Sequence, residues 1–304
     1  VKVKQSPPPS TKDKLYYPGS AACPSCGMSL VFRHMLEVLG SNIVITRTAG
    51  CQGWGSNAPG KTLVNVAMGR SSLPSGGAAA TGIVHGLRAR GRDDVKVVLF
   101  AGDGSFGDMG FCASSGVAER NEDVIVVIYD NETYATTGLQ RSASTPQFAE
   151  TTTTPVGEFS RGNARPKKDL PLIMAAHKVT YVATASVGDI PDFRRKLEKA
   201  KDMKGLRYIQ VSAPCPPAWE YPWAKTIEVA RLGVSTGLWP LYEIEGGKFK
   251  LSHKPRKLKP VSDYIGLQQR FGHVTEEEVE GLQRETEERW SEYKRWEKTG
   301  LKIF

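Results

Sequence analysis

The sequence lacks several features that would assign it to a common class of protein. No apolar run approaches the roughly 20 residues that span a bilayer, so we expect no association with membranes. Residues 1–14 are polar and proline-rich, without the apolar core of a secretory signal, and this composition predicts an extended arm. Cysteines are few and odd in number, at five, which disfavours a disulfide framework and favours a reducing, cytoplasmic location.

A nucleic-acid partner is also not expected. The 41 Lys and Arg residues exceed the 32 Asp and Glu residues and give a formal net charge of +9. However, no stretch interleaves aromatic and basic residues as nucleic-acid-binding modules do. With 304 residues, 39% of them hydrophobic, the chain is instead typical of a folded protein with a sizeable core.

Apolar runs alternate with amphipathic segments along the first two thirds of the chain. Residues 95–102 (VKVVLFAG) and 123–130 (DVIVVIYD) have the near-continuous apolar character of strands covered on both faces. The residues between them suffice for a right-handed parallel crossover. Residues 179–187 and 206–213 repeat the pattern around an amphipathic helix at 189–202. The sequence therefore predicts an α/β fold with a doubly wound parallel sheet.

The last third of the chain has a different composition. From about residue 216, prolines, tryptophans and charges replace the strand periodicity. We therefore divide the chain into an α/β domain at 1–215 and an extension at 216–304 that packs on the core or on a partner. A long helix is expected after Thr275, because Thr275 and Glu278 form a capping box.

Polar residues follow two of the predicted strands at the point where each strand ends. Gly102, Asp103, Gly104 and Ser105 come after the first strand, and Asn131 with Thr133 comes after the second. Ligands bind beyond the carboxyl ends of parallel strands, and if these strands are neighbours Asp103 and Asn131 converge. Carboxylate, amide and carbonyl oxygens suit Mg²⁺, and a diphosphate can complete the octahedron. The glycines would let the backbone approach the phosphates, and the helix after Ser105 would present its amino terminus.

A lone Gly-Asp-Gly is most often a simple turn, because Gly and Asp dominate such turns. Followed by an Asn at the end of the next apolar strand, it is much more specific. This pair resembles the thiamine diphosphate motif, in which Asp and Asn hold the metal that anchors the cofactor's diphosphate.

Four of the five cysteines form a second group. Cys23 and Cys26 are separated by two residues, whereas Cys51 and Cys215 each follow a predicted strand. A Cys-x-x-Cys pair is also typical of a redox dithiol or half of a zinc site, and spacing alone does not distinguish a Zn(Cys)₄ site from a [4Fe–4S] cluster. Cys112 falls within the crossover helix, where we expect a small buried hydrophobic residue.

Taken together, these groups are similar to those of the β subunits of 2-oxoacid:ferredoxin oxidoreductases, the pyruvate synthase group. The similarity covers most of the chain in order: the Cys-x-x-Cys-Gly at 23–27, the Gly-Cys at 50–51, the Gly-Asp-Gly at 102–104, and the stretches at 130–146, 213–216, 227–249 and 259–273. It implies that Cys23, Cys26, Cys51 and Cys215 bind a [4Fe–4S] cluster. It also implies that Asp103, Asn131 and the Thr133 carbonyl bind Mg²⁺.

The resemblance further implies the reaction and its partners. A small 2-oxoacid would be oxidatively decarboxylated on thiamine diphosphate, and electrons would pass through the cluster to ferredoxin. Other subunits would supply the pyrimidine-binding half and further clusters, and use of coenzyme A stays open. The alternatives are the same machinery acting on oxalate or a bulkier oxoacid, and a zinc-stabilised thiamine enzyme without redox activity.

One position departs from the family pattern. Pyruvate-type relatives usually carry Asn beside the substrate at the position of Thr136, and threonine offers only one donor on a shorter stem. Either the Thr136 hydroxyl binds pyruvate, directly or through water, or the pocket is remodelled for another small acid such as oxalate.

Residues 55–62 (GSNAPGKT) match the spelling of a nucleotide-binding P-loop. A P-loop follows a strand directly and opens a helix at its Lys. Here the apolar strand ends well before Gly55, and the residues after Lys61 favour a strand. We therefore expect no ATP site.

Overall fold

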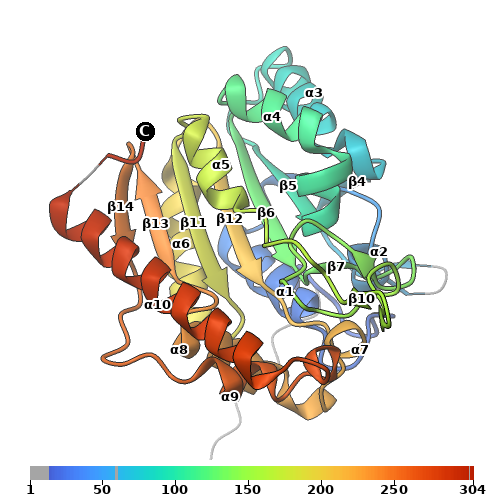
Figure 1. The fold of residues 1–304 in the computed structure, drawn as a ribbon. Coiled ribbons are helices and arrows are strands. Elements are labelled where there is room, and N and C mark those ends of the chain that lie inside the picture. Colours follow the sequence, from blue (N-terminus) through green and yellow to red (C-terminus); the bar gives the residue numbers. More distant parts are fainter. Residues whose placement is uncertain (1–13, 59–60, 301) are drawn as a thin grey trace, which may run out of the picture.

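The computed structural model describes residues 14–58, 61–300 and 302–304, so nearly all of the predicted amino-terminal arm lies outside the described residues. Within that part of the chain, the fold is organised around an eight-stranded sheet of order β14-β13-β11-β12-β6-β5-β1-β4 (Figure 1). The strands are β1 (Ile43–Arg47), β4 (Ala67–Arg70), β5 (Lys96–Gly102), β6 (Val124–Asp130), β11 (Tyr181–Ser186), β12 (Arg207–Ser212), β13 (Tyr242–Glu245) and β14 (Lys248–Leu251).

The six strands from β4 to β11 pair in parallel, as predicted. Every residue of β6 is buried, and in β5 only Lys96 is partly exposed, because helices cover both faces of the sheet. One face carries α1 (Gly27–Leu39) and α6 (Ile190–Asp202). The other carries α3 (Gly76–Arg88), α4 (Phe111–Glu119), α5 (Leu170–Ala176) and α10 (Glu276–Thr299). This arrangement confirms the doubly wound sheet.

The β13–β14 hairpin was not predicted. It adds two antiparallel strands to the edge of the main sheet beside β11. Helix α10 lies across this hairpin (Figure 1), and Phe249 of β14 stacks on Tyr293 and contacts Trp296. The alternating residues 241–251 (LYEIEGGKFKL), with a central Gly-Gly, carry the signal of a hairpin. The capping box at the start of α10 is confirmed.

The rest of the last third lies at the carboxyl ends of the parallel strands. Its short helices pack around the buried Trp219 in a core of their own. The Trp219 indole N–H donates to the Asn131 carbonyl at 2.8 Å, which links this segment to the end of β6. The helices are α7 (Pro216–Trp219), η4 (Trp223–Lys225), α8 (Thr226–Thr236), α9 (Val261–Ile265) and η5 (Gln269–Phe271).

Short helices and strands occur in the loops outside the main sheet. They are α2 (Gln52–Gly55), β2 (Asn57–Ala58), β3 (Lys61–Thr62), η2 (Leu73–Ser75), η3 (Ser105–Met109), β7 (Thr133–Tyr134), β8 (Gln140–Arg141), β9 (Val156–Gly157) and β10 (Ser160–Arg161).

Among the described residues, no helix is long and apolar enough to cross a membrane.

Candidate functional site

The carboxyl ends of β5 and β6 bring the predicted oxygen ligands together. The two strands are neighbours, and Gly102 pairs with Tyr129 just before each strand ends. Asp103, Asn131 and Thr133 are all buried. One end of the Asn131 side-chain amide lies 3.0 Å from Asp103 Oδ1 and 2.8 Å from the Thr133 carbonyl oxygen. The convergence expected from the strand order is therefore present.

The amide oxygen of Asn131 occupies that end, so three oxygens face one another. Without a cation, the amide would have to turn by 180° so that its nitrogen donates to both neighbours. Octahedral Mg²⁺ holds its ligands at about 2.0–2.1 Å, which places adjacent oxygens about 2.9 Å apart. The observed separations match this spacing, so the donor set fits the ion without rearrangement.

The charge on Asp103 also fits a cation. Ser142 Oγ donates to Asp103 Oδ2 at 2.5 Å, while Oδ1 faces the Asn131 amide. Burial, and then the neighbouring Asp130 carboxylate, raise the pKa of Asp103 well above its ordinary value. A divalent cation at this point would reverse both effects and hold the carboxylate ionised.

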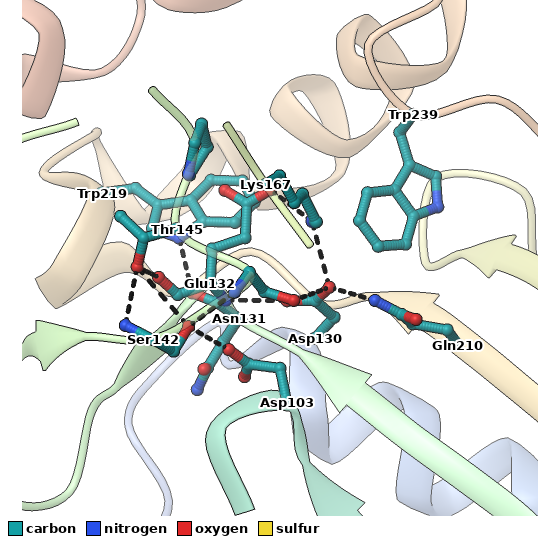
Figure 2. A network of polar contacts seen from close by, with 12 residues as sticks. Asp103, Asp130, Asn131, Glu132, Ser142, Thr145, Lys167, Gln210, Trp219 and Trp239 are labelled. Atoms are coloured by element: carbon teal, nitrogen blue, oxygen red, sulfur yellow. Dashed lines mark hydrogen bonds and ion pairs between the residues drawn. The ribbon is translucent and has the colours of Figure 1, made fainter. Parts of the chain in front are cut away.

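A buried network of charges supports the loop that carries Asn131 (Figure 2). Lys167 Nζ lies 3.0 Å from Asp130 Oδ2 and 3.0 Å from Glu132 Oε1. Arg270 Nη2 lies 2.6 Å from Glu132 Oε2. Burial alone would raise the pKa of Glu132, but Lys167 and Arg270 lower it, so this carboxyl stays charged. Two carboxylates and two cations therefore balance on either side of Asn131.

Aromatic rings and polar side chains complete the network. Lys167 lies over the Trp239 ring and Arg270 over the Trp219 ring, at 4.1 and 4.2 Å from the ring centroids. Three neutral side chains donate to the same loop: Ser144 Oγ to Asp130 Oδ2, Gln210 Nε2 to Asp130 Oδ2, and Thr145 Oγ1 to the Glu132 carbonyl. Sequence reasoning missed this network, because its members are far apart in the chain and form no motif.

The glycines of the Gly-Asp-Gly have a steric role that the sequence did not indicate. A Cβ on Gly104 would lie 2.6 Å from the Tyr134 ring, and a Cβ on Gly102 would lie 3.0 Å from the Tyr129 hydroxyl. A side chain at Gly104 would therefore overlap the Tyr134 ring, whereas one at Gly102 would require the Tyr129 side chain to shift by a few tenths of an ångström. Ser105, which begins η3, donates its hydroxyl to the Leu73 carbonyl at 2.8 Å.

The four predicted cysteines line one cavity of about 330 Å³. Cys26 precedes α1, Cys51 precedes α2, and Cys215 precedes α7, so three chain segments bring them together with Cys23. Asn131 and Thr136 line the same cavity. Asn131 of the oxygen site and the four thiols therefore line the same cavity.

The thiols are partly shielded from water. Burial raises the pKa of Cys51 to about 11, and it also raises the pKa of Cys26 and of Cys215. Each of these three pKa values is raised further by at least one other cysteine of the group, as mutual proximity requires. Without a bound metal these thiols are neutral near pH 7, and a metal centre would deprotonate them.

In residues 14–58, 61–300 and 302–304, no three His, Cys, Asp or Glu side chains are arranged to hold a metal ion. A single zinc ion requires its sulfurs about 2.3 Å from one point. An iron–sulfur cube is bound through four separate iron atoms, so its ligand sulfurs stand farther apart. The four thiols line one cavity, so they supply the number and type of ligands that such a cluster requires.

Two expectations about other residues have different outcomes. Cys112 is exposed, so the prediction that it is buried was wrong; on α4, Ser114, Val117 and Ala118 are the buried residues. The expectation that residues 55–62 form no P-loop agrees with the structure, because β2 and β3 pair antiparallel there. No helix begins at Lys61, which lies in β3.

Comparison with known proteins agrees with this geometry. The family described as "Thiamine pyrophosphate enzyme, C-terminal TPP binding domain" matches residues 47–211, which contain Cys51 and the whole oxygen site. The pyruvate synthase subunit PorB of Methanocaldococcus jannaschii is 42% identical over 285 residues, covering 91% of this chain and 96% of the relative. The chain belongs to the 2-oxoacid:ferredoxin oxidoreductases.

Other relatives place it among the β subunits of that enzyme family. PorB of Methanothermobacter thermautotrophicus is 45% identical over 90% of this chain and 94% of the relative. The ketoisovalerate oxidoreductase subunit VorB of Pyrococcus horikoshii is 39% identical over 92% of each chain. A 2-oxoglutarate:ferredoxin oxidoreductase from Magnetococcus marinus shares the fold, with a TM-score of 0.58 and 22% identity over 72% of this chain and 79% of that one. The chain is therefore an enzyme subunit with the thiamine diphosphate-binding fold, and its relatives are named as parts of larger assemblies.

Proposed function

We propose that this subunit binds thiamine diphosphate through Mg²⁺ held by Asp103, Asn131 and the Thr133 carbonyl. The observation that carries this proposal is that Asp103 Oδ1 and the Thr133 carbonyl oxygen lie 3.0 and 2.8 Å from the same end of the Asn131 side-chain amide. Bound there, the cofactor supplies the carbon nucleophile and electron sink that decarboxylation of a 2-oxoacid requires. The chain's own part is to fix the metal: the Asp130–Lys167–Glu132–Arg270 network holds the Asn131 loop, and Ser142 orients Asp103.

We further propose that Cys23, Cys26, Cys51 and Cys215 hold a [4Fe–4S] cluster. The support is that all four line the cavity that Asn131 and Thr136 also line, so cofactor and cluster would be close. A cluster there would accept electrons one at a time from the decarboxylated substrate and deliver them, through partner subunits, to ferredoxin. The names of the PorB relatives favour pyruvate as the substrate, and the name of VorB supports the alternative of a bulkier 2-oxoacid.

The test is to purify the assembled enzyme without oxygen and measure its metals, cofactor and reaction. We expect bound thiamine diphosphate, ferredoxin reduction that depends on pyruvate, and fewer iron atoms per enzyme in the Cys51→Ala variant than in the parent. Zinc in place of those iron atoms would support the non-redox alternative and contradict the proposal. Pyruvate, 2-oxoisovalerate, oxalate and coenzyme A are tested separately, and faster turnover of oxalate than of pyruvate would contradict the proposed substrate.

A further inference from the structure

Thr136 lies between the oxygen site and the thiols. It occupies the turn of the hairpin formed by β7 and β8, three residues after Thr133, whose carbonyl faces Asn131. Thr136 Oγ1 lies 3.0 Å from Cys51 Sγ, and both residues line the four-cysteine cavity. The residue expected beside the substrate therefore also contacts a proposed cluster ligand.

The turn holds its shape without the Thr136 hydroxyl. Thr137 Oγ1 donates to Gln140 Oε1 at 2.5 Å, and Gln140 Nε2 donates to the Thr137 carbonyl at 2.7 Å. Thr133 Oγ1 donates to the Gln140 carbonyl, and Thr152 Oγ1 donates to the Gly138 carbonyl, each at 2.7 Å. Removing the Thr136 hydroxyl therefore leaves the hairpin with its own hydrogen bonds.

The direction of the contact follows from chemistry. Either atom could donate while Cys51 carries its proton. A sulfur that ligates iron is a thiolate and has no proton, so the threonine hydroxyl must then be the donor. A hydrogen bond donated to a ligand sulfur withdraws electron density and favours the reduced, more negative cluster.

We propose that the Thr136 hydroxyl donates a hydrogen bond to the Cys51 sulfur and thereby raises the reduction potential of the cluster. This inference rests on the cluster of the proposed function. Thr136 is then a positioning residue that acts through Cys51. Because it lies in the turn that follows the proposed metal ligands, it connects the proposed decarboxylation site to the proposed first electron acceptor. Polar contact with the substrate is not required for this role.

The experiment is a redox titration of the assembled enzyme followed by electron paramagnetic resonance. We expect Thr136→Val, which keeps the shape and removes the hydroxyl, to lower the ratio of reduced to oxidised cluster at fixed potential about threefold to tenfold. Tenfold corresponds to about 59 mV for a one-electron couple. Thr136→Ser restores the donor, so its ratio should lie within twofold of the parent enzyme.

Thr137→Val is the control for distortion of the turn, because it removes a hydrogen bond of the hairpin and leaves the Thr136 hydroxyl in place. Its ratio of reduced to oxidised cluster should fall by less than that of Thr136→Val. A Thr136→Val ratio within twofold of the parent, or an equal decrease in Thr136→Ser or Thr137→Val, would overturn the inference. Iron content and the resonance signal of the parent are first compared with those of Cys51→Ala, which identifies the cluster of this subunit among those of its partners. Equal iron and an equal signal in the two would refute the proposed function, whereas an unchanged potential in iron-replete Thr136 variants refutes only the role of Thr136.

Discussion

The oxygen site and the four-cysteine cavity are adjacent, because Asn131 belongs to both, but the protein positions their ligands in different ways. Asp103, Asn131 and Thr133 are buried, and Ser142, Lys167, Trp219 and Arg270 fix them or their immediate neighbours. The cysteines are exposed or only partly buried, and Cys51 Sγ contacts the Thr136 hydroxyl at 3.0 Å.

The difference shows how much of each site the chain can prepare by itself. Oxygen ligands can be positioned before a metal arrives, because the surrounding donors and cations compensate their charges. Thiols offer weak hydrogen bonds, and as thiolates they would repel one another. We therefore infer that the oxygen site is preformed, whereas the sulfur site takes its final geometry from the group it binds.

The largest expected effect comes from breaking the network that prepares the oxygen site. Arg270→Met keeps an apolar stem against Trp219 but leaves Glu132 with Lys167 alone. Removing one partner of a buried ion pair costs about 3–5 kcal/mol of unfolding free energy, because the other charge stays buried. Urea denaturation measures this loss.

The control for that measurement is Arg284→Met on α10. Its side chain is 65% exposed and pairs with Glu280 at 3.8 Å, so the change should stay within about 0.5 kcal/mol. Equal losses in both variants would show that the network does not hold the loop.

Removing the carboxylate itself should separate binding from stability. Asp103→Asn keeps the shape but loses the charge that we assign to Mg²⁺, so thiamine diphosphate binding should weaken by more than the 10–100-fold typical of outer-shell changes. The unfolding free energy without cofactor should not fall, because burial and Asp130 disfavour the charge. Calorimetric titration with Mg²⁺ and the cofactor tests the first statement. Parent-like affinity would remove Asp103 from the metal site.

Changes at the sulfur site should affect iron more than folding. Cys51→Ala and Cys215→Ala remove only a sulfur from the cavity, and we expect the apo chain to lose at most about 1 kcal/mol. Iron per assembled enzyme should fall, together with ferredoxin reduction. Cys112→Ala, on the exposed side of α4, is the control and should retain all iron. Full iron in both cavity variants would exclude them as ligands.

The smallest effect is expected at Lys61, outside both sites. It lies exposed in β3, so Lys61→Ala should change stability by less than about 0.5 kcal/mol and leave cofactor content intact. Thermal stabilisation of the parent protein by ATP that disappears in this variant would show that residues 55–62 do bind nucleotide.

Much of the framework could be predicted because its signals are local. The fully apolar runs of β5 and β6 predict buried parallel strands, and Thr275 with Glu278 marks the start of α10. The β13–β14 hairpin was missed although its alternation is visible, because prolines and tryptophans around it suggested an irregular extension. Cys112 was misplaced because a helical residue's exposure depends on which face meets the sheet.

The sequence by itself determined the alternation of strands and helices and which residues stand at the strand ends, since burial on both faces leaves a continuous apolar signature. The sequence also contained the residues of the oxygen site and the four cysteines of the sulfur site, in their order along the chain. Only the tertiary structure decided that Lys167 and Arg270 neutralise the Asn131 loop and that Thr136 contacts Cys51. These contacts join segments up to 138 positions apart, and the sheet order together with the path of the last third sets them, so no local pattern could encode them.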